Sequence, residues 1–494
     1  MNADPHITAA PLDHATIRSI VIGIMLAMFL AALDQTIVAT AMPTIGRELR
    51  DLEHLPWIAS AYLLSATAVT PLYGKLSDIH GRRRVLLLGI VIFIIGSVAC
   101  ALAPSMLVLI LARSLQGLGG GGLISLAQTI IADVVAPMER ARYQGWIASV
   151  FVTSSVAGPV LGGFFAEHLH WSMIFWINLP LGLLAFWMTG SALRHLPRHE
   201  RPHRLDLIGA LLIVLASVTF MLALTWGGIS YPWSSAPIVL LFVSATLASI
   251  LFAARLLTAA EPLLPLAILL NPVVSCGTAA ACFAMGTFIG LSIYLPVYLE
   301  LVLGLTASGT GLALIPFMGG VVTGATLSGR LMMHLRHYKR PPVIGLAVAT
   351  AGILLLAWRA TGLPLLAVEV IFAIVGVGIG TVLPVTTVAI QNAVNLYQLG
   401  TATGTMNFFR SLGGAVAVAI FGAIVLGGIV APGADPEKLA EVAARGGIDI
   451  ARIFHHLFLA AAGGLALGLA WLLAMAERPL RSGRTHARDG AAVE

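Results

Sequence analysis

Apolar runs, each about as long as a bilayer's hydrocarbon core is thick, recur along the whole chain. A helix needs about 20 apolar residues to cross a core of roughly 30 Å. The 494 residues are 58% hydrophobic and only 10% charged, against about 25% charged residues in soluble domains. We therefore expect an all-α polytopic membrane protein, which excludes a soluble enzyme. A hydropathy window places fourteen spans near 18–41, 55–74, 85–104, 106–130, 143–166, 171–192, 206–226, 236–256, 273–298, 308–330, 341–359, 363–390, 403–428 and 455–475.

Lysine and arginine gather in the loops on one side of these spans. An even number of spans puts both termini on the same side, and most of the basic residues fall there, including the run 82–84 and the stretch 194–204. The other side holds few, and three of those lie in the acidic segment 431–453. The basic loops of polytopic proteins face the cytoplasm. The sequence thus predicts cytoplasmic termini, and it explains the net charge of +6 without nucleic-acid binding.

The chain repeats itself at an offset of 255 residues. Gly74, Lys75 and Leu76 recur as 329–331, the glycines at 119–122 are echoed at 376–380, and Gly158 falls on Gly413. Internal repeats are common in transporters. The repeat predicts a cytoplasmic tail over 1–17, a six-helix bundle over 18–192, two additional helices within 193–272, a second six-helix bundle over 273–475, and a cytoplasmic tail over 476–494.

Asp34 and Arg113 lie inside apolar spans, where a charge costs roughly 2.5–3.5 kcal/mol on insertion scales. Desolvation favours the neutral form of a carboxyl group, so Asp34 is a candidate proton carrier. The competing interpretation is a structural carboxylate bonded to a hydroxyl such as Thr36. Arg113 cannot become neutral by losing a proton, so it needs a partner. Asp34, Gln116 and helix-end carbonyls are the candidates. Helix-to-helix adhesion is the alternative role for this arginine.

Two segments are candidates for moving parts. The loop from Gly74 to Arg84 places one acid among basic residues, and a charge network there would close one side of the protein; the alternative is a simple basic anchor. The predicted gating residues are Gly74, Asp78, Gly81, Arg82, Arg84 and Arg140. In the fifth span a proline loosens the helix and glycines allow close packing. The predicted hinge residues are Gly158, Pro159, Gly162 and Gly163.

Metal and nucleotide sites are not expected. His195, His199 and His203 are spaced by four, but Pro197 and Pro202 prevent the continuous helix that a metal-binding face requires. The glycine-rich stretch 117–122 lies within an apolar span and lacks the Lys-Ser/Thr that follows a phosphate-binding loop. We therefore expect no cofactor.

These segments together resemble the major facilitator superfamily and, within it, the fourteen-helix drug:proton antiporter family. Residues 33–43 are similar to that family's first-helix motif, with Ala39 in place of the usual Asn. The loop 74–84 is similar to the superfamily's signature loop, and Arg113, Gln116 and Gly117 to its fourth-helix motif. Gly158, Pro159, Gly162 and Gly163 resemble the antiporter motif. The resemblance covers the whole chain, including the two central helices.

The resemblance implies a pump that works by alternating access between two six-helix bundles in a bacterial inner membrane. It implies proton coupling by Asp34 and Arg113, a cytoplasmic gate at Asp78 with its arginines, and no cofactor beyond the proton gradient. Met333 stands where the second copy of the loop would have its acid, so the charge switch is one-sided. The expected partners are protons, membrane lipids and small lipophilic substrates, and we expect the chain to act as a monomer.

Substrate chemistry is the least constrained feature. The tenth and thirteenth spans hold no acid to pair with a dication, and aromatic and thioether side chains suit neutral or singly charged lipophilic molecules, although such side chains also simply pack helices together. The predicted cavity residues are Gln35, Tyr62, Gln116, Phe288, Tyr294, Phe317, Met406, Asn407 and Arg410.

The leading hypothesis is a multidrug exporter. A dedicated exporter of one metabolite, siderophore or lipid is the alternative on the same fold. A membrane-embedded lipid transferase is disfavoured, because no D-x-x-D cluster is present. A non-transporting scaffold is also disfavoured, because it would leave the intramembrane charges without a task.

Overall fold

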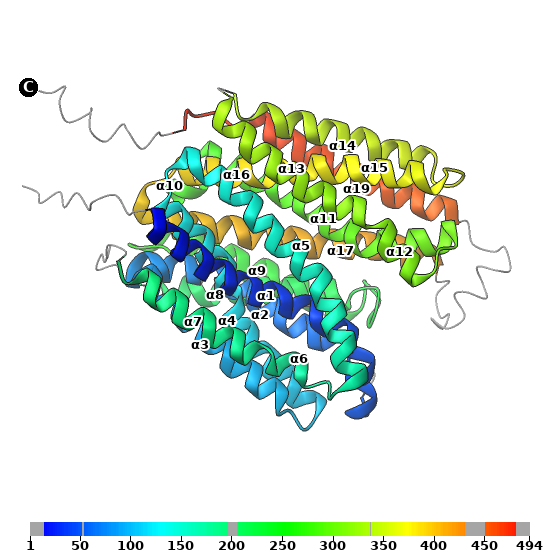
Figure 1. The fold of residues 1–494 in the computed structure, drawn as a ribbon, viewed down its shortest axis with the longest axis horizontal. Helices are drawn as coiled ribbons and strands as arrows, with labels where there is room; N and C mark the ends of the chain where they lie inside the picture. The colour runs from blue at the N-terminus through cyan, green and yellow to red at the C-terminus, as the bar shows by residue number, and fades with distance from the viewer. Residues whose placement is uncertain (1–13, 52–53, 196–204, 336, 430–449, 481–494) are drawn as a thin grey trace, which may run out of the picture.

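The protein is an assembly of long, roughly parallel and antiparallel helices (Figure 1). The structure is a computed structural model that describes residues 14–51, 54–195, 205–335, 337–429 and 450–480. Within these ranges the elements are helical, apart from an isolated bridge between Gly227 and Tyr231. The first half contains α1 (His14–Glu48), α2 (Pro56–His80), α3 (Arg82–Ala101), α4 (Met106–Val134), α5 (Pro137–His168), α6 (Met173–Trp176) and α7 (Asn178–Ala192).

The central segment and the second half follow the same plan of long helices with a few short ones. The central helices are α8 (Leu207–Trp226), α9 (Ala236–Thr258) and the short α10 (Leu266–Leu269). The second half contains α11 (Pro272–Leu303), α12 (Ala307–Ala313), α13 (Ile315–His334), α14 (Arg340–Trp358), α15 (Leu365–Gly380), α16 (Val382–Asn392), α17 (Leu399–Ile429) and α19 (Ile450–Ala474). Of the two tails, only residues 14–17 and 476–480 lie within the described ranges.

The fourteen spans predicted from hydropathy are present as helices. In the described part of the chain, thirteen are long and apolar enough to cross a membrane. The fourteenth is α2, which is 25 residues long but mixes serine, threonine and tyrosine with its apolar residues. Many helices run past the predicted limits, as α1 does in reaching Glu48, because hydropathy marks only the part of a helix that lies in hydrocarbon.

Three spans are interrupted, each just before a proline. α6 gives way to α7 at Ile177, α12 to α13 at Leu314, and α15 to α16 at Thr381. Pro180, Pro316 and Pro384 stand within the first three residues of the second segments. Because proline lacks an N–H and clashes with the preceding turn, it breaks the regular ladder of helical hydrogen bonds.

The two halves repeat the same helix contacts, as the offset of 255 residues predicts. α1 packs on α5 as α11 packs on α17, and α4 packs on α2 and α3 as α15 packs on α13 and α14. Glycines make these contacts close: a Cβ on Gly121 would lie 2.2 Å from the carbonyl oxygen of Ala66 in α2, and one on Gly380 would lie 2.2 Å from that of Val321 in α13. The glycine-rich stretch of α4 is therefore a packing surface. The chain is two six-helix bundles with two extra helices between them in sequence.

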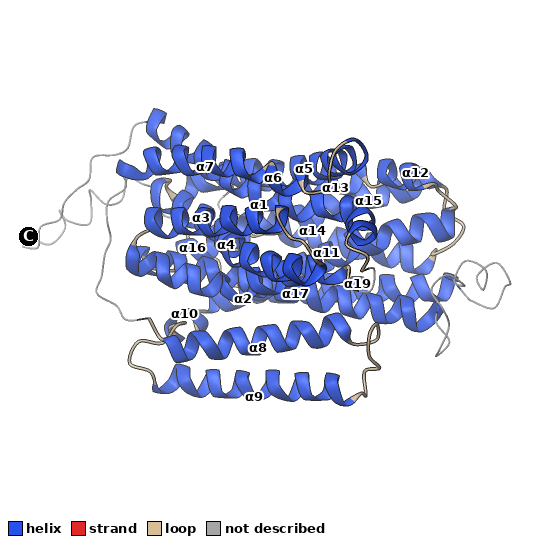
Figure 2. Cartoon of the chain, turned by 90° about the horizontal axis from the view of Figure 1, so that it is seen from below, coloured by secondary structure: helices blue, strands red, loops and turns tan. Residues whose placement is uncertain are grey.

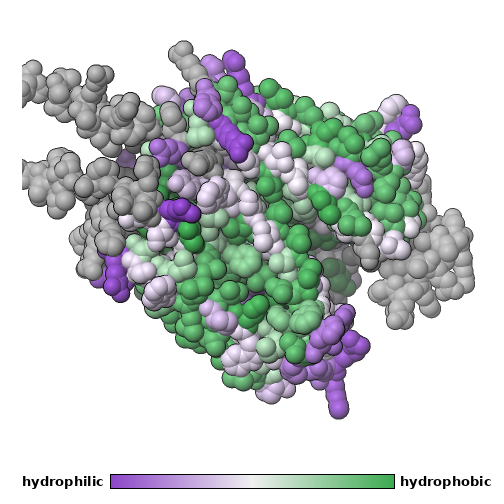
Figure 3. Space-filling view, in the orientation of Figure 1, coloured by the Kyte–Doolittle hydropathy of each residue, from purple (hydrophilic) through white to green (hydrophobic). Residues whose placement is uncertain are grey.

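α8 and α9 lie side by side along one flank of the two bundles (Figure 2). α9 is outermost, and Leu240, Val243, Leu247 and Ile250 on it are more than half exposed. Over the face shown in Figure 3, apolar residues cover the middle of the molecule and hydrophilic ones gather mainly toward its two ends. This distribution is the one expected of a protein surrounded by lipid.

The halves meet where α2 contacts α17 and α5 contacts α13. We call the end of the molecule that contains the α2–α3 junction at Gly81 and the α4–α5 junction at Ala136 the basic end. The far end contains the α1–α2 loop and the turn between α8 and α9.

Candidate functional site

Asp34 lies at the centre of a polar cluster inside the first bundle. Its side chain is fully buried, and its carboxylate accepts hydrogen bonds from Arg113 Nη1 at 2.6 Å, Gln116 Nε2 at 2.7 Å and Asn178 Nδ2 at 2.9 Å. The donors come from α4 and α7, so the carboxylate links α1 to two neighbouring helices. A buried charge is tolerated when it is paired and hydrogen-bonded in this way.

Arg113 is equally buried, and two of its nitrogens form hydrogen bonds. Its Nε donates to the carbonyl oxygen of Ile58 at 3.0 Å and its Nη1 also reaches Gln116 Oε1 at 2.5 Å. The guanidinium lies 4.5 Å from the centre of the Tyr62 ring and 5.7 Å from that of Phe175. Two of the partners considered from the sequence, Asp34 and Gln116, are both present. The aromatic faces add a cation–π contribution to the ion pair.

Ser97 and Asn178 belong to this cluster and were missed by the sequence analysis. Ser97 Oγ accepts from Gln116 Nε2 at 2.7 Å and from Asn178 Nδ2 at 3.3 Å. A polar residue inside an apolar span was the available signal for both. The structure also rejects Thr36 as the partner of Asp34, because the Thr36 hydroxyl donates to the carbonyl oxygens of Leu33 at 3.0 Å and Ser154 at 2.8 Å.

α5 crosses α1 directly beside Asp34, at the predicted hinge. A Cβ on Gly158 would lie 2.0 Å from Thr36 Oγ1, and one on Gly162 would lie 2.3 Å from the carbonyl oxygen of Ile37. Pro159 sits within the helix and lacks the N–H that would bond to Ser155. Gly163 differs, because a Cβ added there would have no neighbouring atom within 4 Å. Gly158 and Gly162 therefore set the α1–α5 distance, and Gly163 does not.

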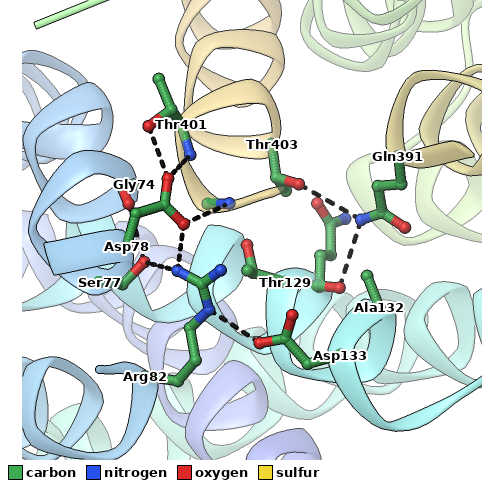
Figure 4. A network of polar contacts seen from close by, with 12 residues as sticks. Gly74, Ser77, Asp78, Arg82, Thr129, Ala132, Asp133, Gln391, Thr401 and Thr403 are labelled. Atoms are coloured by element: carbon green, nitrogen blue, oxygen red, sulfur yellow. Dashed lines mark hydrogen bonds and ion pairs between the residues drawn. The ribbon is translucent and has the colours of Figure 1, made fainter. Parts of the chain in front are cut away.

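At the basic end, Asp78 of α2 reaches across to the second bundle (Figure 4). Its carboxylate accepts hydrogen bonds from the backbone N–H groups of Gly400 at 3.0 Å and Thr401 at 2.8 Å, and from Thr401 Oγ1 at 2.6 Å. These N–H groups belong to the first turn of α17, where they have no partner within the helix. A carboxylate at this position also interacts favourably with the helix dipole. Asp78 thus joins the two halves.

Arg82 holds the Asp78 carboxylate from the other side. It forms an ion pair with Asp78, donates from Nε to Asp133 Oδ2 at 2.8 Å, and donates from Nη1 to Ser77 Oγ at 2.7 Å. Gly74 lets α17 come close, since a Cβ there would lie 2.4 Å from the Gly400 carbonyl oxygen. Asp133 was not predicted from the sequence, which named Arg140 as the gating residue beyond the loop from Gly74 to Arg84. Its position at the end of the fourth span, on the same side as the basic loop, was the available signal.

The other predicted gating residues lie nearby in different roles. Gly81 adopts a left-handed φ of 87° at the α2–α3 junction, a conformation that favours glycine. Arg84 is exposed, whereas Arg140 is buried. Arg140 donates from Nε to the carbonyl oxygen of Val135 at 2.8 Å and from Nη2 to that of Ala132, so it caps the end of α4.

A second set of hydrogen bonds joins the halves further in from the basic end. Asn407 Nδ2 of α17 donates to Gln128 Oε1 of α4 at 2.8 Å, and Gln391 Nε2 of α16 donates to the Gln128 carbonyl oxygen at 3.3 Å. Arg410 donates to Asn407 Oδ1 at 3.1 Å, and no ion pair to an acid is found for it among the described residues. The interface between the halves is therefore closed over its basic half.

A cavity of about 380 Å³ lies in the other half of the same interface. It is lined by Gln35 of α1 and by the far-end portions of α2, α8, α11 and α17. The polar groups on its wall are Gln35, Ser60, Thr67, Thr225, Tyr294 and Ser411, and the lining residues include no acid or base. Its size falls in the range of small-molecule sites. An uncharged, mostly apolar wall fits lipophilic molecules.

The residues predicted for the cavity fall into four groups, and only the first of these lines it. Gln35 and Tyr294 line it. Tyr62 and Gln116 lie in the Asp34 cluster, and Asn407 and Arg410 lie at the hydrogen bonds between the halves. The remaining three do not line the cavity: Phe288 and Phe317 stack with ring centres 5.6 Å apart in the second bundle, and Met406 is fully buried against α16. These three side chains pack helices together, which was the alternative that the sequence left open.

The match to known families is decisive for the class of protein. Residues 24–418 match the model of the Major Facilitator Superfamily. The chain belongs to this superfamily. Its members and structural neighbours are transporters rather than enzymes, so the chain is a multi-pass membrane transporter.

Relatives of known name in the major facilitator superfamily support this assignment. The multidrug transporter protein MdtP of Bacillus subtilis is 33% identical over 82% of this chain and 75% of its own length. Multidrug resistance protein 3 of the same organism is 33% identical over 83% of this chain and 80% of its own. The solved structure of the human organic anion transporter MFSD10 has a TM-score of 0.64 at 17% identity, covering 92% of this chain and 99% of that one. The last likeness concerns the fold alone.

Proposed function

We propose that this major facilitator protein is a proton-coupled antiporter that exports lipophilic small molecules from the cytoplasm by alternating access. The basic end faces the cytoplasm of a bacterial cell, both termini lie there, and the protein works as a monomer in the inner membrane without a cofactor. The names of the relatives support multidrug export. The positive-inside rule supports the orientation.

The observation that carries the proposal is the Asp34–Arg113 ion pair, fully buried in the membrane interior at 2.6 Å. A buried pair that only joined helices would gain little over apolar packing, because desolvation costs as much as the attraction returns. The same desolvation cost is explained if the carboxylate releases its proton when it is paired with Arg113 and binds a proton when the two separate.

The position of Asp34 links its protonation to both the cavity and the hinge. The next residue, Gln35, lines the cavity, and Thr36 donates to the Ser154 carbonyl of α5. Protonation of Asp34 removes its charge from Arg113 and so loosens the contacts that hold α1, α4 and α7 together. The resulting shift of α1 passes to α5, which packs against α13 of the second bundle.

The conformation described here suits the release step of an exporter. The basic end is closed by Asp78, Gln128 and Asn407, and the cavity lies in the far half of the interface. In this state a substrate leaves toward the outside while a proton reaches Asp34 from that side. Opening of the basic end then requires the Asp78 bonds to α17 to break, after which the proton leaves to the cytoplasm.

The energetics allow this coupling. One proton moving through about 100 mV releases roughly 2.3 kcal/mol. At about 1.36 kcal/mol per factor of ten, this energy sustains about a fifty-fold gradient of a neutral substrate with one-to-one coupling.

The test is transport in liposomes with an imposed pH gradient. We expect uptake of several unrelated lipophilic cations and neutral dyes into vesicles whose lumen is acidic, and loss of uptake when a protonophore collapses the gradient. Uptake that persists after the collapse would contradict antiport. A dedicated exporter of one metabolite, siderophore or lipid is the second candidate. Transport of all the unrelated dyes at similar rates would exclude it.

A further inference from the structure

The central helix α8 contacts both bundles at once. It packs on α2 of the first half and on α17 of the second, while α9 lies on its outer side (Figure 2). Near the basic end, Asp206 caps α8 by accepting from Gly209 N at 3.0 Å and from Arg255 Nε of α9 at 3.1 Å. The helix is therefore fixed at one end to its neighbour and lies along the line where the two bundles meet.

The last turns of α8 form part of the cavity wall. Met221, Leu224 and Thr225 line the cavity, and so do Gly227, Gly228 and Ile229 of the following turn. Gln35 of the first bundle and Tyr294 of the second line the same cavity. The Thr225 hydroxyl donates to the Met221 carbonyl oxygen at 2.8 Å, so its bonding need is met within the helix and its methyl group is free to contact an apolar molecule.

The turn after α8 is held in one shape by aromatic side chains. Trp226 meets Trp57 of α2 edge to face, with ring centres 5.3 Å apart, and lies 6.0 Å from the ring of Tyr231. Gly228 has a left-handed φ of 75°, and a Cβ there would lie 2.6 Å from Trp233 Nε1. This position requires glycine on both counts. A turn built so tightly gives the cavity a wall of defined shape.

We propose that α8 and the turn 227–229 are part of the substrate site, and that Met221 and Thr225 determine which lipophilic molecules the transporter accepts. This inference rests on the export function proposed above. The two bundles alone leave this side of the cavity without protein, so the size limit on the substrate is set where α8 supplies Met221, Leu224 and Thr225. The chemical class is a neutral or singly charged apolar molecule, because the wall holds no acid or base.

The experiment measures transport of n-alkyltriphenylphosphonium ions, from methyl to hexyl, by the full-length protein in liposomes. Met221→Ala enlarges the cavity and Thr225→Met narrows it. Since one methylene in an apolar site changes selectivity by roughly tenfold or more, we expect the preference for long over short chains to rise about tenfold in Met221→Ala and to fall about tenfold in Thr225→Met. The matched controls are Leu240→Ala, on the exposed face of α9, and Thr219→Met, whose hydroxyl bonds within α8 in the same way but lies outside the cavity.

A second measurement does not require the protein to tolerate a larger or smaller side chain in the cavity wall. In a background without Cys100, Cys276 and Cys282, we label Thr225→Cys and Leu240→Cys with a maleimide in the presence and absence of hexyltriphenylphosphonium. We expect the ligand to slow maleimide labelling at position 225 at least fivefold and to leave labelling at position 240 unchanged. If wild type transports the series but neither chain-length preference nor labelling responds at α8, the inference is wrong. If wild type transports none of the probes in the panel above, the proposed function fails instead.

Discussion

The Asp78 carboxylate of α2 and Thr401 of α17 are joined by two hydrogen bonds, of 2.8 Å to the backbone N–H and 2.6 Å to the hydroxyl. One residue of the first bundle therefore caps a helix of the second. The corresponding position in the second copy of the loop is Met333, which cannot make such a bond. The charge-based closure of the basic end is one-sided, and a single substitution can test it.

Asp78→Asn will favour opening of the basic end. The substitution removes the charge that Arg82 and the first turn of α17 stabilise. A loss of about 2 kcal/mol, within the range for charge-assisted hydrogen bonds, shifts the balance between closed and open states about thirtyfold. Faster maleimide labelling of Thr403→Cys, which is fully buried at the interface, measures this shift in a background free of other cysteines.

The control for this prediction is Glu139→Gln. Glu139 is an exposed acid at the same end of the molecule, so its loss changes the local charge equally without touching α17. Equal labelling rates in the two variants would show that Asp78 does not hold the halves together.

Gly158→Ala will disrupt the contact between α5 and α1. The added methyl group would overlap Thr36 Oγ1, and relief of such overlap in a packed interior costs about 1–3 kcal/mol. We expect transport to fall at least tenfold and the midpoint of thermal unfolding to drop. Gly163→Ala is the matched control, because its methyl group meets no neighbour, and alanine favours helix by about 1 kcal/mol. Normal transport by Gly158→Ala would show that the close contact is not needed for function.

Asn178→Ala will weaken the polar cluster around Asp34. Asn178 donates to the Asp34 carboxylate, and alanine leaves that hydrogen bond unmade at a fully buried site. A hydrogen bond to a charged group contributes about 1.5–3 kcal/mol, so we expect a lower midpoint of thermal unfolding and slower proton-coupled transport. Thermal unfolding in detergent and initial transport rates at a fixed pH difference measure the two effects.

Thr189→Val provides the comparison for Asn178→Ala. Thr189 is also buried on α7, but its hydroxyl bonds only within that helix, to Ala185 and Phe186. We expect its unfolding midpoint and transport rate to stay close to those of wild type. Wild-type values of both in Asn178→Ala would mean that the Asn178 hydrogen bond does not support the Asp34 cluster.

The helices and their repeat could be predicted because both depend on patterns along the chain. Apolar length predicts a span, and glycines such as Gly158 and Gly413 recur at one offset because both allow a close helix contact. Asp34 was one of several partners considered for Arg113. The pairing could be predicted because a buried charge left without a partner of opposite sign is strongly destabilising.

Contacts that depend on how helices are rotated could not be predicted in the same way. The packing of the two bundles determines which side of α17 faces Asp78. The sequence around Thr401 therefore does not indicate that this residue contacts Asp78. Aromatic residues are equally ambiguous: Tyr294 lines the cavity and Phe317 packs in a closed core, although both lie in apolar helices. The contribution of α8 to the cavity was not foreseen, because the repeat places α8 outside both bundles.

The central claim is that Asp34 carries the coupled proton, and the most direct test compares wild type with Asp34→Asn in liposomes loaded with a pH dye. Asparagine keeps the size of the side chain but cannot bind and release a proton. Addition of a lipophilic cation that wild type transports is expected to change the lumenal pH with wild type and to leave it unchanged with Asp34→Asn, whose far-UV circular dichroism should remain that of wild type. Substrate-driven proton movement of equal size in the two proteins would contradict the account.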